Sequence, residues 1–589
     1  MNEKPKSIWK KSWTGLHWLR AWLMVVAATF FTVLIVTLFI PGRPRNFSDW
    51  WPALVFTLLV SVVVATAFVG LWAFIRRFFC RRNFKRFLFG LACFVTLIAL
   101  FYAEEDWRGW HAWQKFKREW EAKGERFDYA SVIPPPVPDD QNFALTPIVA
   151  SSYEMFFDKS GHEVQPRNTN VIDRLSMITW RDNHWAKIPK LDGWQASKKS
   201  DLKAWQAYFR SPPPTNSVET NSFPVTSQPQ SPADDILRAL SKYDSAIEEI
   251  RQASQLPHSR FPLTYNEEDP AVIPLPHLGA LRSCVQALNL RALADLQNGR
   301  SEKALADVKL SLRLADSIRT EPFLISHLVR IAMVNLTLQP MYEGLVEHKW
   351  SEAQLVELDS ELAKLDFLPD YGTAVRGDMG CQKEIIDYLR RHPEQFPNLS
   401  AYGDFIKAPL LARIIWHSIP SGWFYQNQLR CSRFMIQQYL PLADLEHRIV
   451  SPASVRHADA AVGLEFRHVS PYNRLESLLL PAFGGAVKKF AYAQTSVDLA
   501  RVAIALERYR LAHGGYPESL DALAPQFIAK IPHDIINGQP LHYRPETNGQ
   551  FVLYSVGWNE ADDGGEVGRI KYGTPDISEG DWVWRYPAK

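Results

Sequence analysis

The sequence has few cysteines, and their spacing excludes two common uses of them. The five are Cys80, Cys93, Cys284, Cys381 and Cys431, and no two of them form a CxxC pair. Zinc knuckles and redox motifs depend on such pairs, so neither is predicted. One disulfide among the last three is compatible with the sequence, which does not assign it.

The short motifs of several large enzyme classes are also missing. The chain has no HExxH, GxSxG, P-loop or GxGxxG-type stretch. A zinc protease, an α/β-hydrolase, a P-loop nucleotidase and a dinucleotide-binding enzyme are therefore not predicted. Ser200 and Lys203 form an SxxK, but this pattern is common by chance.

A group of acid–base side chains gathers in a proline-rich stretch. It consists of His258, Glu267, Glu268, Asp269 and His277. Loops of this kind can carry metals or acid–base catalysts. A solvated loop with capping acids is the more common use of such a stretch, and it is the interpretation we favour.

Acidic residues are nearly absent from the first 103 positions. Residues 1–103 contain 13 of the 66 basic residues but only Glu3 and Asp49 of the 63 acidic ones, which leaves 53 basic and 61 acidic residues after them. The basic charge therefore belongs to the N-terminal end. Because the remainder is mildly acidic, a nucleic-acid partner is not expected.

Long apolar runs without charge occupy this N-terminal end. They are Ala21–Ile40, Ala53–Ile75 and Phe87–Ala103. A helix needs about 20 residues to span a bilayer, with a lower limit of about 17. The first two runs are long enough, and the third is at the limit, with a buried core helix as its alternative. We predict that residues 1–103 form an anchor of three transmembrane helices in a lipid bilayer.

The charged residues that flank these runs indicate the orientation. Lysines and arginines gather before the first run and between the second and third, whereas the intervening loop has only Arg43 and Arg45. By the positive-inside rule, the N-terminus and the second loop are cytoplasmic, and everything after residue 103 is extracytoplasmic. We expect a multi-pass protein of the inner cell membrane. A cleaved signal peptide is not expected, because the charged lead is long and no small-residue cleavage site follows.

A chain of 589 residues is too long for one core, so we expect several regions after the anchor. Residues 104–234 should contain a stalk helix, a mixed or irregular stretch and a Pro/Ser-rich linker. Aromatic side chains line one face of the expected helix Asp106–Gly124: Trp107, Trp110, Trp113, Phe116 and Trp120. This face suits a membrane surface and packing on the protein's own domain equally well.

Residues 235–475 have mostly helical periodicity, and we predict a helical domain there. The helix Leu278–Leu296 should end at Asn298-Gly299, and Ser301 should cap the helix that follows. This pair resembles a single tetratricopeptide-like hairpin, but the period does not recur. Ser351 and Gln354 form a capping box at the start of another helix.

The C-terminal part combines one long helix with strand signals. A helix is predicted over Thr495–His513, where Gly514-Gly515 ends it. Two strand-like runs then flank Asn548-Gly549, which is a strong hairpin signal. The prediction is a long helix followed by a small antiparallel sheet.

An ordered set of motifs extends through this part of the chain. It comprises Gly515-Tyr516-Pro517, Leu520, Leu523, Ile531-Pro532, Asp534, Tyr543, Tyr554-Ser555, Gly557, Asp562-Asp563-Gly564-Gly565, Asp576-Ile577 and Trp582. In this order the last 95 or so residues resemble the globular domain of type II secretion major pseudopilins. The rest of the chain resembles uncharacterised bacterial membrane-anchored proteins.

The resemblance implies a calcium site, because pseudopilins of this type use the matching loop for calcium. The residues concerned are Asn559, Asp562, Asp563 and Asp576. Their side chains offer the oxygen ligands that calcium requires, and the neighbouring glycines let backbone carbonyls turn inward. A solvated acidic turn is the alternative, since Asn559 stands where the family usually has an acid. No leader or hydrophobic helix directly precedes Thr495, so incorporation into a filament is not expected.

The predicted fold class is therefore an α-helical membrane anchor of three spans, a mainly α-helical outer domain, and a C-terminal α+β pseudopilin-like domain over residues 495–589. We expect a non-enzymatic module for interaction or assembly with protein partners at the cell envelope. The alternative is an extracytoplasmic enzyme whose site is assembled from sequence-distant residues of the helical domain.

Overall fold

The computed structural model describes residues 15–38, 51–78, 81–153, 155–157, 163–166, 173–180, 183, 185–191, 193–213, 223–265, 269–395, 417–480, 483–547, 549–570 and 575–587. Contacts divide the chain into two compact units, Met1–Glu104 and Glu105–Lys589. We call them the first and the second unit. The regional boundaries expected at residues 234, 475 and 495 lie inside the second unit and stay predictions.

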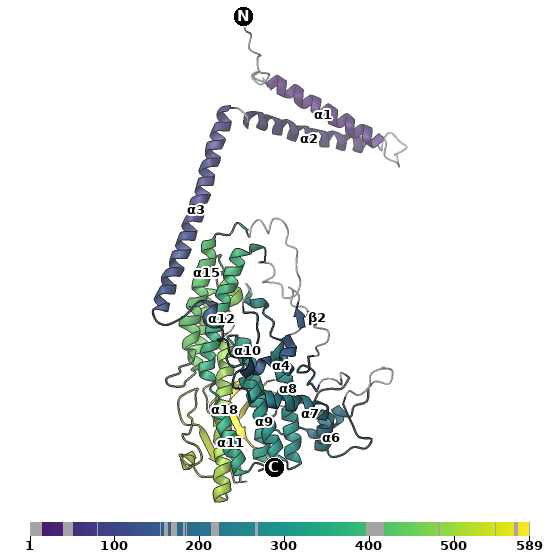
Figure 1. Ribbon diagram of the computed structural model, residues 1–589. Helices are drawn as coiled ribbons and strands as arrows, with labels where there is room; N and C mark the ends of the chain where they lie inside the picture. Colours follow the sequence, from purple (N-terminus) through teal and green to yellow (C-terminus); the bar gives the residue numbers. More distant parts are fainter. Residues whose placement is uncertain are drawn as a thin grey trace. The chain divides into compact units, whose positions relative to one another are not determined.

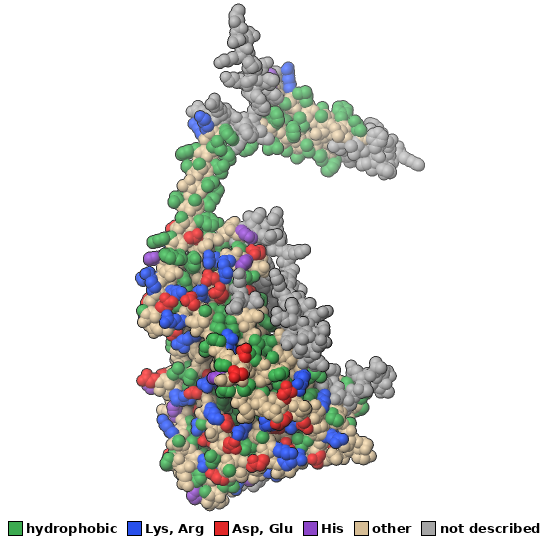
Figure 2. Space-filling model, in the orientation of Figure 1, with side chains coloured by type: hydrophobic (Ala, Val, Ile, Leu, Met, Phe, Trp, Pro, Cys, Tyr) green, Lys and Arg blue, Asp and Glu red, His purple; other side chains and the backbone are tan. Residues whose placement is uncertain are grey.

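The first unit is helical and apolar. Helices α1 (Gly15–Leu38) and α2 (Trp51–Phe78) lie side by side (Figure 1), and the indole of Trp22 donates a hydrogen bond to the hydroxyl of Thr66 over 3.0 Å. Hydrophobic side chains cover the surface of these helices (Figure 2). Two segments, Val55–Phe74 and Phe84–Glu121, are long and apolar enough to cross a membrane. Three crossings remain a prediction.

Helix α3 (Arg81–Glu121) joins two elements that the sequence analysis treated separately. The apolar run ending at Ala103 and the aromatic helix starting at Asp106 form one unbroken helix of 41 residues. The side chains of Trp107 and Trp110 are exposed, whereas Trp113 and Phe116 are buried in the core of the second unit. Packing on the protein's own domain is therefore confirmed for the C-terminal part of the helix, and contact of Trp107 and Trp110 with a membrane surface stays a prediction.

The second unit is mainly helical. Its helices are α4 (Pro147–Ala150), α5 (Leu202–Phe209), α6 (Pro232–Leu240), α7 (Asp244–Ala253), α8 (Pro276–Gln297), α9 (Ser301–Asp316), α10 (Leu324–Val346), α11 (Glu352–Leu362), α12 (Phe367–Arg391), α15 (Ser421–Phe434), α16 (Pro452–Glu465), α17 (Arg474–Leu479) and α18 (Phe483–His513), together with the C-terminal part of α3. Cys284, Cys381 and Cys431 are buried within it as free thiols, so no disulfide joins them.

Helices α8, α9 and α10 pack on one another, and the predicted hairpin of the first two is confirmed. Gly299 ends α8 with a φ of 73°, in the left-handed region that glycine adopts without strain. The prediction for Ser301 is wrong, because Ser301 is the first residue of α9 and its hydroxyl accepts a hydrogen bond from Gln354 Nε2 instead. The capping box of Ser351 and Gln354 is confirmed.

Helix α18 is the central element of the second unit (Figure 1). It packs against α10, α11, α12 and α16, and also against strands of the C-terminal sheet. It begins at Phe483 rather than at the predicted Thr495. From Phe483 to Glu507 most of its side chains are buried, on every side of the helix. The helix therefore belongs to the cores of both the helical and the C-terminal regions.

The C-terminal sheet has the order β3–β4–β7 and is antiparallel throughout. Its strands are β3 (His542–Pro545), β4 (Phe551–Ser555) and β7 (Trp582–Arg585). All five residues of β4 are buried, and β4 and β7 pack on α18. The predicted hairpin is confirmed, with Gly549 at a φ of 76°, although Asn548 lies outside the described residues. The helix-then-sheet order is therefore as expected.

Two smaller hairpins complete the strands of the described residues. Strands β1 (Met155–Phe157) and β2 (Glu163–Pro166) pair with each other, and β5 (Val567–Arg569) pairs with β6 (Pro575–Gly580). The second hairpin lies between β4 and β7 in the sequence and carries part of the loop predicted to bind calcium.

Candidate functional site

The predicted calcium loop folds into a compact turn whose polar groups bind one another. Asn559 donates from Nδ2 to Asp563 Oδ2 over 2.8 Å, and its own Oδ1 accepts from the amide of Ala561. Asp562 Oδ1 accepts from the hydroxyl of Tyr554 and from the amide of Gly564, at 3.0 and 2.9 Å. Three of the four predicted ligands therefore lie within one turn after β4.

Asp581 is the buried acid of this loop, and the sequence analysis did not select it. Its Oδ2 accepts from the amide of Gly565 at 2.6 Å, and its Oδ1 accepts from the amide of Asp563 at 3.3 Å. Burial raises the pKa of Asp581, and the two amide hydrogen bonds oppose that increase. The carboxylate holds the turn against the start of β7.

Asp576, the fourth predicted ligand, lies on β6. It accepts a hydrogen bond from the amide of Ser578 at 2.9 Å. Within the described residues, no hydrogen bond or ion pair links it to Asn559, Asp562 or Asp563, and no group of three His, Cys, Asp or Glu side chains is placed to hold a metal ion. The loop between β5 and β6 includes residues 571–574, which lie outside the described part.

A second polar cluster is fully buried between α8 and α10. His277 Nε2 lies 2.6 Å from Glu321 Oε1, and Ser326 donates its hydroxyl to the other oxygen of Glu321. All three side chains are at most 2% exposed. The ring of His277 stacks on Phe261 at 4.1 Å between centroids, which closes one side of the cluster. The serine binds the glutamate and not the histidine, so this is not the geometry of a serine nucleophile activated by a base.

Arg330 extends the buried polar region along α10. Its guanidinium is 0% exposed and bonds to Asp370 of α12, while Asp316 at the end of α9 lies 3.3 Å away. Arg319 also contacts Asp370. A buried guanidinium is tolerated only when it is paired in this way. The pairs fix α9, α10 and α12 against one another.

His327 lies next to this region, but its ring is uncharged. Burial, followed by the positive charge of Arg330, lowers its pKa to about 4. The ring is therefore neutral at ordinary pH. With His277, Glu321 and Arg330 all sealed from solvent, a substrate cannot reach these groups in the folded protein, and the cluster acts as a structural joint.

Those of the weaker sequence candidates that the structure describes do not assemble into a site. Ser200 donates its hydroxyl to the carbonyl of Leu191, while Lys203 is exposed. Asp269 caps the short helix that starts at Pro270, through the amide of Ala271. Among its proposed neighbours, Glu267 and Glu268 lie outside the described residues, and His277 is buried against Glu321.

Residues of the C-terminal motifs bind one another across the domain. The hydroxyl of Tyr543 donates to the carbonyl of Pro517 at 2.7 Å. Asp534 is 1% exposed and accepts from the hydroxyl of Ser555 at 2.9 Å and from the amide of Val556 at 3.0 Å. These contacts connect the loop after α18 with strands β3 and β4. The motif residues therefore have structural roles.

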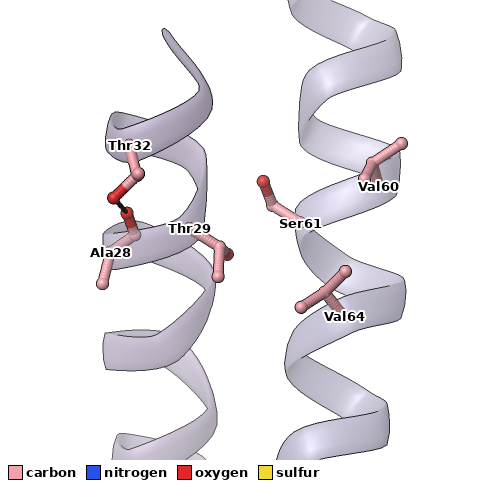
Figure 3. Close-up of a pocket in the computed structure, with 6 residues that line it drawn as sticks. All are labelled: Ala28, Thr29, Thr32, Val60, Ser61 and Val64. Atoms are coloured by element: carbon pink, nitrogen blue, oxygen red, sulfur yellow. Dashed lines mark hydrogen bonds between the residues drawn. The ribbon is translucent and has the colours of Figure 1, made fainter. Parts of the chain in front are cut away.

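The first unit contains a small notch between α1 and α2, with a volume of about 240 Å³ (Figure 3). The hydroxyls of Thr29 and Thr32 donate to carbonyls of their own helix, such as that of Ala28. Ser61 lies on the side of α2 that faces α1 and is buried. Small and hydroxyl-bearing residues of this kind allow apolar helices to approach closely.

Comparison of the chain with protein-family models, with curated proteins and with solved structures finds no match. The functional interpretation therefore depends on the residues themselves. The sequence analysis missed the partners Glu321, Arg330 and Asp370. Arg330 and Asp370 stand in ordinary helical sequence and Glu321 in the loop between α9 and α10, and only the folded chain brings each to its partner.

Proposed function

We propose that this chain is a membrane-anchored protein of the cell envelope whose second unit is an extracytoplasmic module for interaction or assembly. The observation that carries the proposal is the continuity of α3. One helix contains an apolar segment that is exposed throughout and a segment that is packed in the core of the second unit. Exposed apolar surface of this extent requires a partner, and a bilayer matches its length.

The link between α3 and the second unit is polar and buried. Glu105 is 5% exposed, and it accepts hydrogen bonds from the indole of Trp423 and from the hydroxyl of Tyr472, each at 3.0 Å. Asp106 accepts from the amide of Gly422 at 2.7 Å. Two acidic residues at the start of the unit thereby hold the first turn of α15 and the loop before α17.

Close backbone packing reinforces this link. A Cβ atom added to Gly422 would lie 1.9 Å from the carbonyl oxygen of Glu105, and one added to Gly109 would lie 2.3 Å from the carbonyl oxygen of Gly422. Only glycine permits this approach. An anchor helix joined so tightly to a large unit supports a role in which the position of that unit at the membrane matters.

The relation to major pseudopilins remains part of the proposal. Its support is the long helix α18 followed by the sheet β3–β4–β7, together with the contacts among the motif residues Tyr543, Asp534 and Ser555. Calcium binding also remains a proposal. Its support is the turn that brings Asn559, Asp562 and Asp563 together.

The test of the module function is the state of the intact protein in its own membrane. After extraction in mild detergent, we expect the 67.4-kDa chain to migrate on a native gel as part of a larger complex. Chemical cross-linking before extraction should connect the second unit to other envelope proteins. A chain that migrates as a monomer, both with and without cross-linker, would contradict the proposal.

The enzyme alternative has less support. Its strongest candidate groups, His277, Glu321 and Ser326, are sealed inside the second unit, and their hydrogen bonds already join α8 to α10. Groups that reach solvent only by unfolding cannot act on a substrate.

A further inference from the structure

A second cleft lies on the second unit, beside α5. It has a volume of about 740 Å³ and is bounded by residues 186–190, by residues 198–201 and by the exposed side of α5. Small side chains such as Ala186, Ala204 and Ala207 line part of it. Sites for small molecules have volumes of about 300 to 1,000 Å³, so the cleft is of a suitable size.

The charged side chains of this cleft are mostly basic. Four lysines line it: Lys187, Lys190, Lys198 and Lys199. Lys199 is paired with Glu347 at 2.9 Å. The other three lysines are exposed, and the described residues provide no ion pair for any of them. Among the described residues of the lining, the one acid is Asp201, which caps α5 by accepting from the amide of Ala204.

Side chains of α10 hold the backbone of residues 193–200, which carries Lys198 and Lys199. Gln339 of α10 accepts through Oε1 from the amides of Gly193 and Trp194, at 2.9 and 2.6 Å. The same side chain donates from Nε2 to the carbonyl of Lys198 at 3.1 Å. Glu343, one turn further along α10, accepts from the amide of Ser200 at 2.7 Å. This side of the cleft is therefore held in place before any ligand arrives, which lowers the entropic cost of binding.

We propose that this cleft binds a small soluble ligand that carries two or more phosphate or carboxylate groups. Three ammonium groups that have no ion pair among the described residues attract anions, and a lysine ammonium binds phosphate as a point charge. The lysines stand on two segments, at positions 187–190 and at 198, so a ligand with at least two anionic groups can contact both. This inference does not depend on the proposed module function, because it is argued only from the residues that line the cleft.

The test uses the full chain in nanodiscs of phosphatidylcholine, a lipid without net charge. Isothermal titration calorimetry with tripolyphosphate and with citrate should give saturable binding of at least one probe, with a Kd below about 1 mM. The triple variant Lys187→Ala, Lys190→Ala, Lys198→Ala should bind that probe at least about tenfold more weakly, since it removes the three free charges.

A charge-matched variant separates the cleft from general electrostatics. Lys303→Ala, Lys364→Ala, Lys530→Ala removes three exposed lysines that do not line the cleft, and it should bind as the natural chain does. Equal loss in both variants, or no saturable binding of either probe, would overturn the proposal. Binding that appears only when phosphatidylglycerol is added to the nanodisc would also overturn it, because it would identify a lipid surface as the anion.

Discussion

Several buried charged residues in the second unit are paired, and the pairs connect separate elements of the structure. Arg330 is paired with Asp370, and His277 lies against Glu321. An unpaired buried charge would lower the stability of the fold by roughly several kcal/mol, whereas a paired charge connects the elements that carry the two residues. In these two pairs, the buried histidine or carboxylate connects separate helices and loops.

Glu507 of α18 is a buried, paired carboxylate whose contribution to stability can be measured directly. It is 1% exposed, and it accepts hydrogen bonds from Arg510, His348 and the hydroxyl of Tyr516. Replacing it by glutamine, Glu507→Gln, keeps the volume but removes the charge. We expect the free energy of unfolding at pH 7 to fall by about 2 kcal/mol, the scale of hydrogen bonds to a charged group. Urea denaturation of the detergent-solubilised chain measures this.

The pH dependence of that loss has a defined sign. Burial alone would raise the pKa of Glu507, but hydrogen bonds from Arg510 and His348 and their charges lower it from 4.5 to about 2. The stabilisation is therefore complete above pH 4.5 and declines as the pH falls towards 2. The difference between the natural chain and Glu507→Gln should shrink over that window. Glu518→Gln, at an exposed position, is the control, and an equal effect there would refute the assignment.

At the scale of elements, local sequence signals predicted the end of a helix or the turn of a hairpin where that feature depends only on adjacent residues. The capping box at Ser351 and the hairpin around Gly549 depend on a few adjacent residues, and both are confirmed. The start of α18 depends on a distant contact. Gly484-Gly485 normally disfavours a helix by about 1 kcal/mol per glycine. A Cβ on Gly484 would lie 2.5 Å from the carboxylate of Asp459 on α16, so the glycine allows a close approach to α16 that the sequence does not reveal.

The candidate sites also divide into those built from adjacent residues, which the sequence predicts, and those built from distant residues, which it does not. The turn that contains Asp562 and Asp563 was found because its acids are adjacent in the sequence. The cluster of His277 with Glu321, and the lysine cleft held by Gln339, were not found. Their members come from separate helices and loops, and periodicity places a residue on a face without identifying what lies opposite.

The crossing of α3 and α15 provides a prediction at this scale. Gly422→Ala places a methyl group against the carbonyl of Glu105 and should destabilise the chain by about 2 kcal/mol, as overpacking does. Gly279→Ala, in the first turn of α8, meets open space and should be neutral or slightly stabilising, because alanine favours helix. Thermal unfolding of the two variants gives the comparison. Identical midpoints would show that the crossing is loose.

Calcium provides a second prediction for an element, the loop between β4 and β7. A cation that binds only the folded chain adds about 2.7 kcal/mol at a hundredfold excess over its Kd. We expect the unfolding midpoint of the full chain to fall when chelator replaces calcium, and Asp576→Ala to abolish the difference. Glu579→Ala removes an equal charge from the same loop and should keep the difference. The same midpoint with calcium and with chelator would identify an ordinary acidic turn.

At the scale of the whole molecule, the two units differ in their surfaces: one exposes apolar side chains and the other exposes charged ones. The first unit has exposed apolar helices, and the second has a surface on which acidic and basic side chains are interspersed (Figure 2). The 13 basic residues of positions 1–103 are concentrated before α1 and in its first two turns, in the last turn of α2 and in the first two turns of α3. Both features concern how the chain meets a membrane, so the topology is the prediction on which the proposed function depends.

Three crossings with a cytoplasmic N-terminus place residue 45 outside, residue 80 inside and residue 120 outside. Alkaline phosphatase fused after each position should be active, inactive and active in turn, and a cytoplasmic reporter should give the reverse pattern. We expect the basic residues at the end of α2 and the start of α3 to set this order, because they resist transfer across the membrane. Replacing Arg76, Arg77, Arg81 and Arg82 by glutamine, with two lysines added beside Arg43, should therefore increase the fraction of chains with residue 120 inside. The same number of glutamine substitutions on the second unit, at Lys303, Lys364, Lys530 and Lys123, should leave the topology unchanged. If residue 120 of the natural chain reports as cytoplasmic, the second unit lies on the inner side, and an extracytoplasmic module is excluded.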